Sequence, residues 1–334
     1  MKQELIRFFQ NQAELNGASY TAGTNSVNFA LTPTVLQKLL DRVMQSSAFL
    51  SKVNHQSVTL QGGRALGLGI GKPIASRTNT ADGTKKRTPK KVHEMTELYD
   101  YLCVQTNFDT MITYAELDAW RELPDFEQRI VNRIISQIAL DTLMIGWNGT
   151  KVSADTDLTA NPLLQDVNKG WLQKIRDAGG THFRSGVTVG TGAGANYKNI
   201  DELVDNFINT YIHEAYQERE DLVVIPARNL VNHKYTGIWN AAGANTELIA
   251  AGQLDRDKYH FANRAIERTS FMPAGTLLVT PVNNLSIYTQ KDSSRRTLKD
   301  VPEGDRLEAF QSQNVAYVVE DYDACVLVEN ITFV

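Results

Sequence analysis

The clearest hydrophobic pattern in the chain lies in residues 124–149. Apolar side chains recur at four-residue spacing through its first half, at Phe126, Ile130, Ile134 and Ile138. This spacing is typical of the buried face of a helix, and only one charge, Asp141, interrupts the apolar second half. Pro124 suits a first helical position, and Gly146 and Gly149 suit a helix end. The pattern predicts a helix over 124–148, roughly 35 to 40 Å long, which is also compatible with the core helix of an α/β enzyme.

The first 32 residues predict an arm or a removable segment. They begin as a short amphipathic helix whose apolar positions are Leu5, Ile6, Phe8, Phe9 and Leu15. Residues 16–26 follow, rich in Gly, Ser, Thr and Asn and without a hydrophobic period. Thr32 and Pro33 then supply the N-cap and first-turn residues of a second helix.

Residues 57–109 predict a long two-stranded excursion with a basic tip. The segment is Gly-rich and polar, and its basic residues are Lys85, Lys86, Arg87, Lys90 and Lys91. An excursion of this length usually has a function or a partner. The basic tip is either a solvated hairpin end or a contact with an acidic neighbour or nucleic acid. Residues 104–114 alternate as the returning strand.

The remaining segments predict an α+β protein. Helices are expected at 115–122, at 200–218 and as a short pair in 228–252. Strands are expected at 221–225, 276–280, 285–289, 316–320 and 325–329. No internal repeat is found.

Composition narrows the class of protein. The chain has 334 residues, 42% of them hydrophobic, which is enough for a sizeable core. A net charge of -4 argues against a dedicated nucleic-acid binder. Cys103 and Cys325 lie in separate apolar runs and are expected to be buried and reduced. Without a membrane span or a signal-peptide core, the chain is expected in the cytoplasm.

Catalytic chemistry finds little support in the sequence. The six histidines lack metal-ligand spacing, and neither a nucleophile elbow nor a zinc-protease helix motif is present. We therefore predict no catalytic residue, no metal ligand and no cofactor. The alternative is a dinucleotide-binding enzyme, because Gly190, Gly192 and Ala195 fit the pattern GxGxxA before a helix. The strand before that loop is weak, and no acidic residue stands where a ribose ligand belongs.

Several stretches together resemble one family, the major capsid proteins of the P-two type of tailed phages (Peduovirus group). The stretches are AELNG at 13–17, IAS at 74–76, TNTADGT at 78–84, QTNFD at 105–109, NPLLQDV and GWLQK between 161 and 174, DLVVI at 221–225, NLSIY at 284–288, RR at 295–296 and YVVEDY at 317–322. They run through nearly the whole chain in one order.

The resemblance implies a Hong Kong 97-like phage capsid fold of class α+β, with an N-terminal arm, an extended E-loop, a long spine helix, and peripheral and axial domains. It implies an arm at 1–55, an E-loop at 56–110, a peripheral domain at 111–194 with the spine helix at 124–148, an axial domain at 195–305, and peripheral strands at 306–334.

The same resemblance implies a set of partners. Copies of the chain would form hexamers and pentamers of an icosahedral shell around double-stranded DNA, which they would contact non-specifically. An internal scaffolding protease and a portal protein would take part, and no membrane would. The protease would cut near Phe29 and Ala30, removing residues 1–29. The protein is then expected in the virion, and in the host cytoplasm during assembly.

Overall fold

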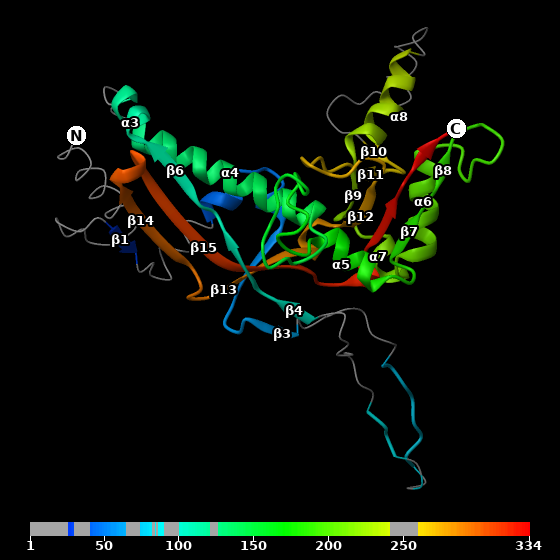
Figure 1. Ribbon diagram of the computed structural model, residues 1–334. Coiled ribbons are helices and arrows are strands. Elements are labelled where there is room, and N and C mark those ends of the chain that lie inside the picture. Colours follow the sequence, from blue (N-terminus) through cyan, green and yellow to red (C-terminus); the bar gives the residue numbers. More distant parts are fainter. Residues whose placement is uncertain are drawn as a thin grey trace.

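A computed structural model of the chain describes residues 26–29, 41–64, 74–81, 84, 86–89, 100–120, 126–240 and 260–334 (Figure 1). Its helices are α3 (Tyr114–Trp120), α4 (Phe126–Asn148), α5 (Trp171–Ala178), α6 (Ile200–Tyr211), α7 (Glu214–Gln217) and α8 (Arg228–Asn240). Its strands are β1 (Ser26–Phe29), β2 (Asn54–Val58), β3 (Gly62–Arg64), β4 (Asp100–Leu102), β5 (Val104–Asn107), β6 (Thr110–Thr113), β7 (Phe183–Ser185), β8 (Thr188–Val189), β9 (Leu222–Pro226), β10 (His260–Phe261), β11 (Arg264–Ala265), β12 (Leu277–Pro281), β13 (Leu285–Gln290), β14 (Arg295–Val301), β15 (Arg306–Val319), β16 (Val326–Glu329) and β17 (Thr332–Phe333).

The larger sheet is built around β15. Its strand order is β1-β14-β15-β13-β2, and β5 and β6 also pair with β15. The first half of β15 lies between β14 and β6. The second half pairs with β5 over 312–315 and with β13 over 315–319. Leu307 and Val315 of β15 are buried on the face that α4 covers. The long helix and the long strand therefore enclose one core, and β3 and β4 lie on the other side of the sheet (Figure 1).

Helix α4 confirms the predicted long helix, and the mostly covered second half is confirmed as well. Residues 142–149 are nearly all buried, whereas Ile130 and Ile134 are half-buried. The predicted first position, Pro124, lies outside the described residues. The interpretation of Gly146 as a helix end is wrong, because α4 continues through Asn148 and Gly146 has no positive φ. A Cβ at Gly146 would lie 2.4 Å from the Trp171 ring, so glycine is needed there for close packing.

An aromatic cluster joins α4, α5 and β15. The fully buried rings of Trp147 and Trp171 lie 5.1 Å apart, and Trp171 meets Tyr317 edge-on at 5.2 Å. The indole Nε1 of Trp171 donates to the carbonyl of Ser286 at 2.9 Å, so its polar atom is satisfied inside the core. Edge-on pairs of this kind add about 0.5–1.5 kcal/mol beyond their buried area. The cluster thus fixes where α5 crosses between the two sheets.

The second sheet has the order β7-β16-β12-β9, with α6 packed against it and α8 projecting from its end (Figure 1). Its core is formed by apolar side chains of α6 and the strands, among them Leu203, Val204, Phe207, Val224, Val279 and Val328. The predicted single helix over 200–218 is wrong. Ile212 is extended at ψ 136°, and the His213 ring then accepts from the backbone N–H of Ala215 to begin α7.

The strands after residue 280 are shared between the two sheets. Strands β13 and β14 pair with β15 in the larger sheet, whereas β16 pairs with β12 in the second sheet. The strand predicted over 104–114 is two strands, β5 and β6, which follow β15 in one register. The ladder is interrupted at Phe108 and Asp109, where the Asp109 side chain accepts the backbone N–H of Gln311 at 3.1 Å.

Both cysteines are buried and free, as predicted. Burial raises the pKa of Cys103 to about 11, so its thiol stays protonated at neutral pH. Within the described part of the chain, no helix is long and apolar enough to cross a membrane.

Candidate assembly surfaces

The predicted excursion leaves the body through a short two-stranded base made of β3 and β4. Arg64 and Asp100 face each other across this pair, with Nε 2.9 Å from Oδ1. Both side chains are about half exposed (47% and 48%), so the ion pair contributes no more than about 1 kcal/mol. The base is held to the sheet by Tyr101, whose ring lies 5.1 Å from that of Tyr288. The root of the excursion is therefore attached to β13.

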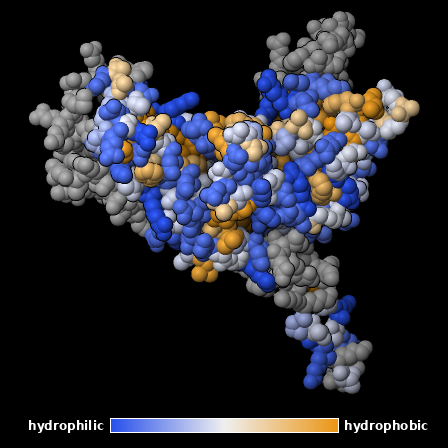
Figure 2. All heavy atoms as spheres, viewed as in Figure 1, coloured by the Kyte–Doolittle hydropathy of each residue, from blue (hydrophilic) through white to orange (hydrophobic). Residues whose placement is uncertain are grey.

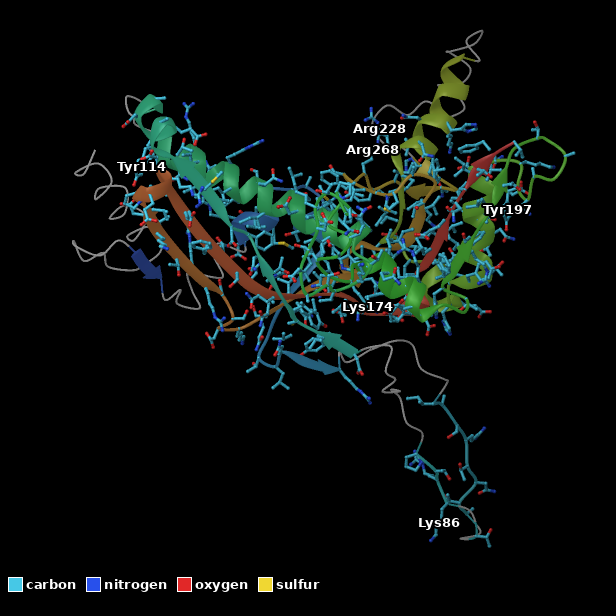
Figure 3. All side chains as sticks on the ribbon, viewed as in Figure 1. Lys86, Tyr114, Lys174, Tyr197, Arg228 and Arg268 are labelled. Atoms are coloured by element: carbon cyan, nitrogen blue, oxygen red, sulfur yellow. The ribbon has the colours of Figure 1, made fainter. Side chains whose placement is uncertain are left out.

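The described part of the excursion extends far from the body. Residues 74–81 and 86–89 contain no helix or strand, and Lys86 and Arg87 are exposed. Lys86 lies at the far end in Figure 3. The other three residues of the predicted basic tip, Lys85, Lys90 and Lys91, lie outside the described residues. The two cations that are described can reach a separate molecule.

Large apolar side chains are exposed on the excursion, two beside its base and one further along it. Leu60 is 66% exposed, Leu102 60% and Ile74 55%. Isolated apolar residues are common on surfaces, but three large ones on one projecting segment favour burial by a second molecule. The face visible in Figure 2 is otherwise mostly hydrophilic.

A second exposed apolar group lies on the loop after α4, and sequence reasoning missed it. Leu158 is 65% exposed and Val152 47%. The loop is held in shape by Asp166, which is only 3% exposed. Its Oδ2 accepts from the backbone N–H of Asp157 at 2.8 Å and from the side-chain amide of Asn161 at 3.0 Å. A buried carboxylate with several donors fixes a loop, so these apolar side chains are held at the surface in one conformation.

The predicted cleavage junction lies at the end of an edge strand. Phe29 is the last residue of β1 and pairs with Arg296 of β14, while Ala30 lies outside the described residues. Strand β1 ends the path of the larger sheet and pairs with β14 alone among the described strands. An edge strand can be detached by breaking one ladder of hydrogen bonds.

The glycine-rich loop does not support the dinucleotide alternative. A Cβ on Gly190 would lie 1.8 Å from the carbonyl oxygen of Val334, so the end of the chain fills the space above this glycine. The N–H of Val334 donates to the carbonyl of Val189 at 3.0 Å, and β17 pairs with β8 in a separate two-stranded sheet. The glycines therefore accommodate a neighbouring strand.

The titratable groups with shifted pKa values are structural. Burial raises the pKa of Tyr216, whose hydroxyl donates to the Asp321 carboxylate, and that of Tyr288, whose hydroxyl donates to Glu320 at 2.8 Å. The thiols near these pairs, Cys103 and Cys325, are fully buried, and burial raises the pKa of both, so neither is an available nucleophile at neutral pH. No cluster of three His, Cys, Asp or Glu that could hold a metal is present in the parts of the chain that the structure describes.

Comparison with known proteins identifies one family over nearly the whole chain. A family model described as phage major capsid protein, P2 family, matches residues 4–331. The chain is 40% identical over 334 residues to the capsid protein of Escherichia phage P2, covering 97% of this chain and 92% of that one. It is 36% identical over 337 residues to the major capsid protein of Serratia phage KSP20, covering 98% and 95%.

Solved structures show the same fold. A chain of the satellite phage P4 procapsid matches with a TM-score of 0.80 and 36% identity, covering 100% of this chain and 99% of that one. A capsid chain of an empty GTA particle matches with a TM-score of 0.53 at 15% identity, covering 86% and 90%. At that identity the second likeness concerns the fold alone.

Proposed function

The chain belongs to the P2 family of phage major capsid proteins, and from that premise we propose that it forms hexamers and pentamers of an icosahedral shell around double-stranded DNA. The fold is of the Hong Kong 97 type, and its role in a tailed phage is that of a structural protein of the virion. The observation that carries the proposal is the match over residues 4–331 together with the procapsid fold.

The excursion between β3 and β4 is the proposed E-loop, and its proposed site is the surface of a neighbouring subunit. Its exposed Leu60, Leu102 and Ile74 are the apolar part of that contact. Lys86 and Arg87, with Lys85, Lys90 and Lys91, are the cationic part. Each exposed ion pair contributes only about 0.2–1 kcal/mol. Closed symmetry repeats the contact at every subunit, so weak contacts add up to a stable shell.

We assign the peripheral domain to the larger sheet with α4, and the axial domain to the second sheet with α6, α7 and α8. The joint between them is the aromatic cluster of α4, α5 and β15. This assignment keeps the spine helix at α4 and moves β13 and β14 to the peripheral domain, because they pair with β15. The projecting helix α8 is then part of the axial tip.

An internal scaffolding protease is the proposed partner at the N-terminus, and its proposed cut lies between Phe29 and Ala30. The edge position of β1 supports this, because a protease must bind its substrate as an extended strand and β1 can be detached from β14. Assembly in the host cytoplasm and attachment to a portal protein complete the proposal. The net charge of -4 suits a container that contacts its DNA non-specifically.

Co-expression of the chain with its scaffolding protease tests this proposal, with electron microscopy and intact-mass measurement of the assembled subunit. Closed shells whose subunit lacks residues 1–29 are the expected result. Shells of full-length subunits would leave the capsid role standing and refute the cut. A full-length chain that forms neither shells nor capsomers at any salt concentration would refute the assembly proposal.

A further inference from the structure

A groove of about 740 Å³ runs along one flank of α4, beside the edge of β6. It is lined by α4 side chains between Arg129 and Asp141 and, across from them, by residues 107–112 and Glu116. Among the described strands, β6 pairs with β15 alone, so its other edge faces the groove. In Figure 1, β6 runs beside α4 along this stretch.

The groove has an apolar floor and charged ends of opposite sign. The floor is formed by Ile130, Ile134 and Ile138, four residues apart on one face of α4. Arg129 and Arg133 lie at the end where α4 begins, and Glu116 of α3 lines the same end, which leaves a net charge of +1 there. Asp141 lies at the other end, with Asp109 from the two residues between β5 and β6.

From this groove we propose that residues 4–15 of the same chain dock there as a helix that runs antiparallel to α4. The length fits, because Arg129 and Asp141 are 12 positions apart and Glu4 and Leu15 are 11 positions apart. At 1.5 Å per residue both span about 17–18 Å. The apolar positions of the segment, Leu5, Ile6, Phe8, Phe9 and Leu15, form one face that matches the apolar floor.

The charges select the antiparallel direction. Lys2, Glu4 and Arg7 lie near the beginning of the segment and together carry a net charge of +1, and Glu14 lies near its end. In the antiparallel direction the net positive beginning meets the end of the groove with Asp141, and Glu14 meets the end with Arg133. The two helix dipoles are then also opposed, which is favourable. A parallel helix would instead bring the net positive beginning of the segment to the two arginines and Glu14 to Asp141.

Residues 4–15 can reach the groove from Ser26, the first residue that the structure describes. Ser26 pairs with Lys299, which pairs with Glu308, which pairs with Met111 at the groove. These three strand spacings amount to about 14 Å. The direction of β1 sends the preceding residues toward the α3 end of the sheet, where the docked segment would end. Residues 16–25, fully extended, span up to about 33 Å, so the linker suffices.

One consequence rests on the proposed function. A cut after Phe29 would turn the docked segment into a separate peptide that only the groove and β1 hold, so its departure would uncover the floor of the groove during maturation. The docking itself is a property of the single, uncut chain, and it can be tested without a shell.

Thiol labelling of the unassembled full-length chain tests the docking. The probe is Gln137→Cys on the groove flank of α4, and the matched control is Gln128→Cys, which is also exposed but lies outside the groove. The native thiols are both buried and do not compete. We expect Gln137→Cys to react about tenfold more slowly, or slower still, than in a chain that also carries Phe8→Asp and Phe9→Asp. Gln128→Cys should react equally in both chains.

A charge swap tests the direction. Arg133→Glu should speed labelling at residue 137 through repulsion of Glu14, and adding Glu14→Lys should restore protection. Equal labelling with and without the Phe8 and Phe9 changes would overturn the proposal. So would protection lost on dilution, which would mean that a second copy covers the groove. Protection seen only in assembled shells and independent of Phe8 and Phe9 would assign the groove to a neighbour's E-loop.

Discussion

Replacing Gly146 with alanine tests whether the joint between the two sheets depends on close approach at this position. Alanine stabilises a helix interior by about 1 kcal/mol relative to glycine, so propensity alone predicts a more stable protein. The structure predicts the opposite, because the new Cβ would lie 2.4 and 2.7 Å from two carbons of the Trp171 ring. That ring is fully buried and held between Trp147 and Tyr317, so it cannot move aside freely. Overpacking costs about 3 kcal/mol and the better helix propensity returns about 1 kcal/mol, so the free energy of unfolding should fall by about 2 kcal/mol.

A double-mutant cycle separates this clash from other effects. Trp171→Phe removes the outer ring atoms that the alanine would meet, and it loses the hydrogen bond to Ser286. In that background Gly146→Ala should be neutral or stabilising by up to about 1 kcal/mol, a coupling of about 2–3 kcal/mol. Urea unfolding followed by circular dichroism measures all four chains. A stabilising Gly146→Ala in the parent chain, or the same effect in both backgrounds, would refute the reasoning.

Three further predictions concern the tip, a half-buried phenol and the glycine loop. Replacing Lys85, Lys86 and Arg87 with alanine should lower the yield of shells and the sensitivity of that yield to salt, since each lost ion pair contributes about 0.2–1 kcal/mol. Lys151→Ala is the control. If electron microscopy shows unchanged shells, the tip is only solvated surface. Tyr114→Phe should cost about 1.5–3 kcal/mol at pH 7, because the phenol donates to the Asp300 carboxylate. Burial and that hydrogen bond raise the pKa of Tyr114 to about 12, so the extra stability of the wild-type protein should shrink as the pH rises from 10 to about 12 and vanish above it. Thermal melts that show a constant stability difference across that pH range would contradict this. Gly190→Ala should destabilise by about 1–3 kcal/mol, because φ is +152° and Val334 occupies the space; a nicotinamide dinucleotide that raises the melting temperature of the parent chain would instead revive the enzyme alternative.

The local patterns of the sequence predicted α4 well, because its signal is contained within the helix itself. The packing role of Gly146 could not be predicted from the local pattern, because its contact partner Trp171 lies in the next helix along the chain. The break at Ile212 was hidden because its apolar side chain continues the helical period, although the backbone there is extended. Its capping residue, His213, is an uncommon one.

The strand β14 was missed because only Leu298 among its seven residues is buried. Its strand structure comes from pairing with β15 and β1, which no local pattern reveals. The motif at Gly190 misled for the opposite reason. Its local pattern suggested a dinucleotide site, but the glycine makes room for Val334. Nothing in the sequence indicated that Leu158 is exposed, because an apolar loop residue can be buried or exposed depending on where the fold positions the loop.

Strand β15 determines where this protein will tolerate added sequence. Its first half is paired on both sides and its second half pairs with β5 and then with β13. Its side chains alternate between the α4 core and the opposite face. One inserted residue would turn every later side chain to the wrong face and misalign two ladders together. Foreign peptides inserted there should abolish folding. The exposed stretch around Lys86 pairs with no strand, so a peptide inserted after Thr88 should leave the subunit folded and be displayed far from its body.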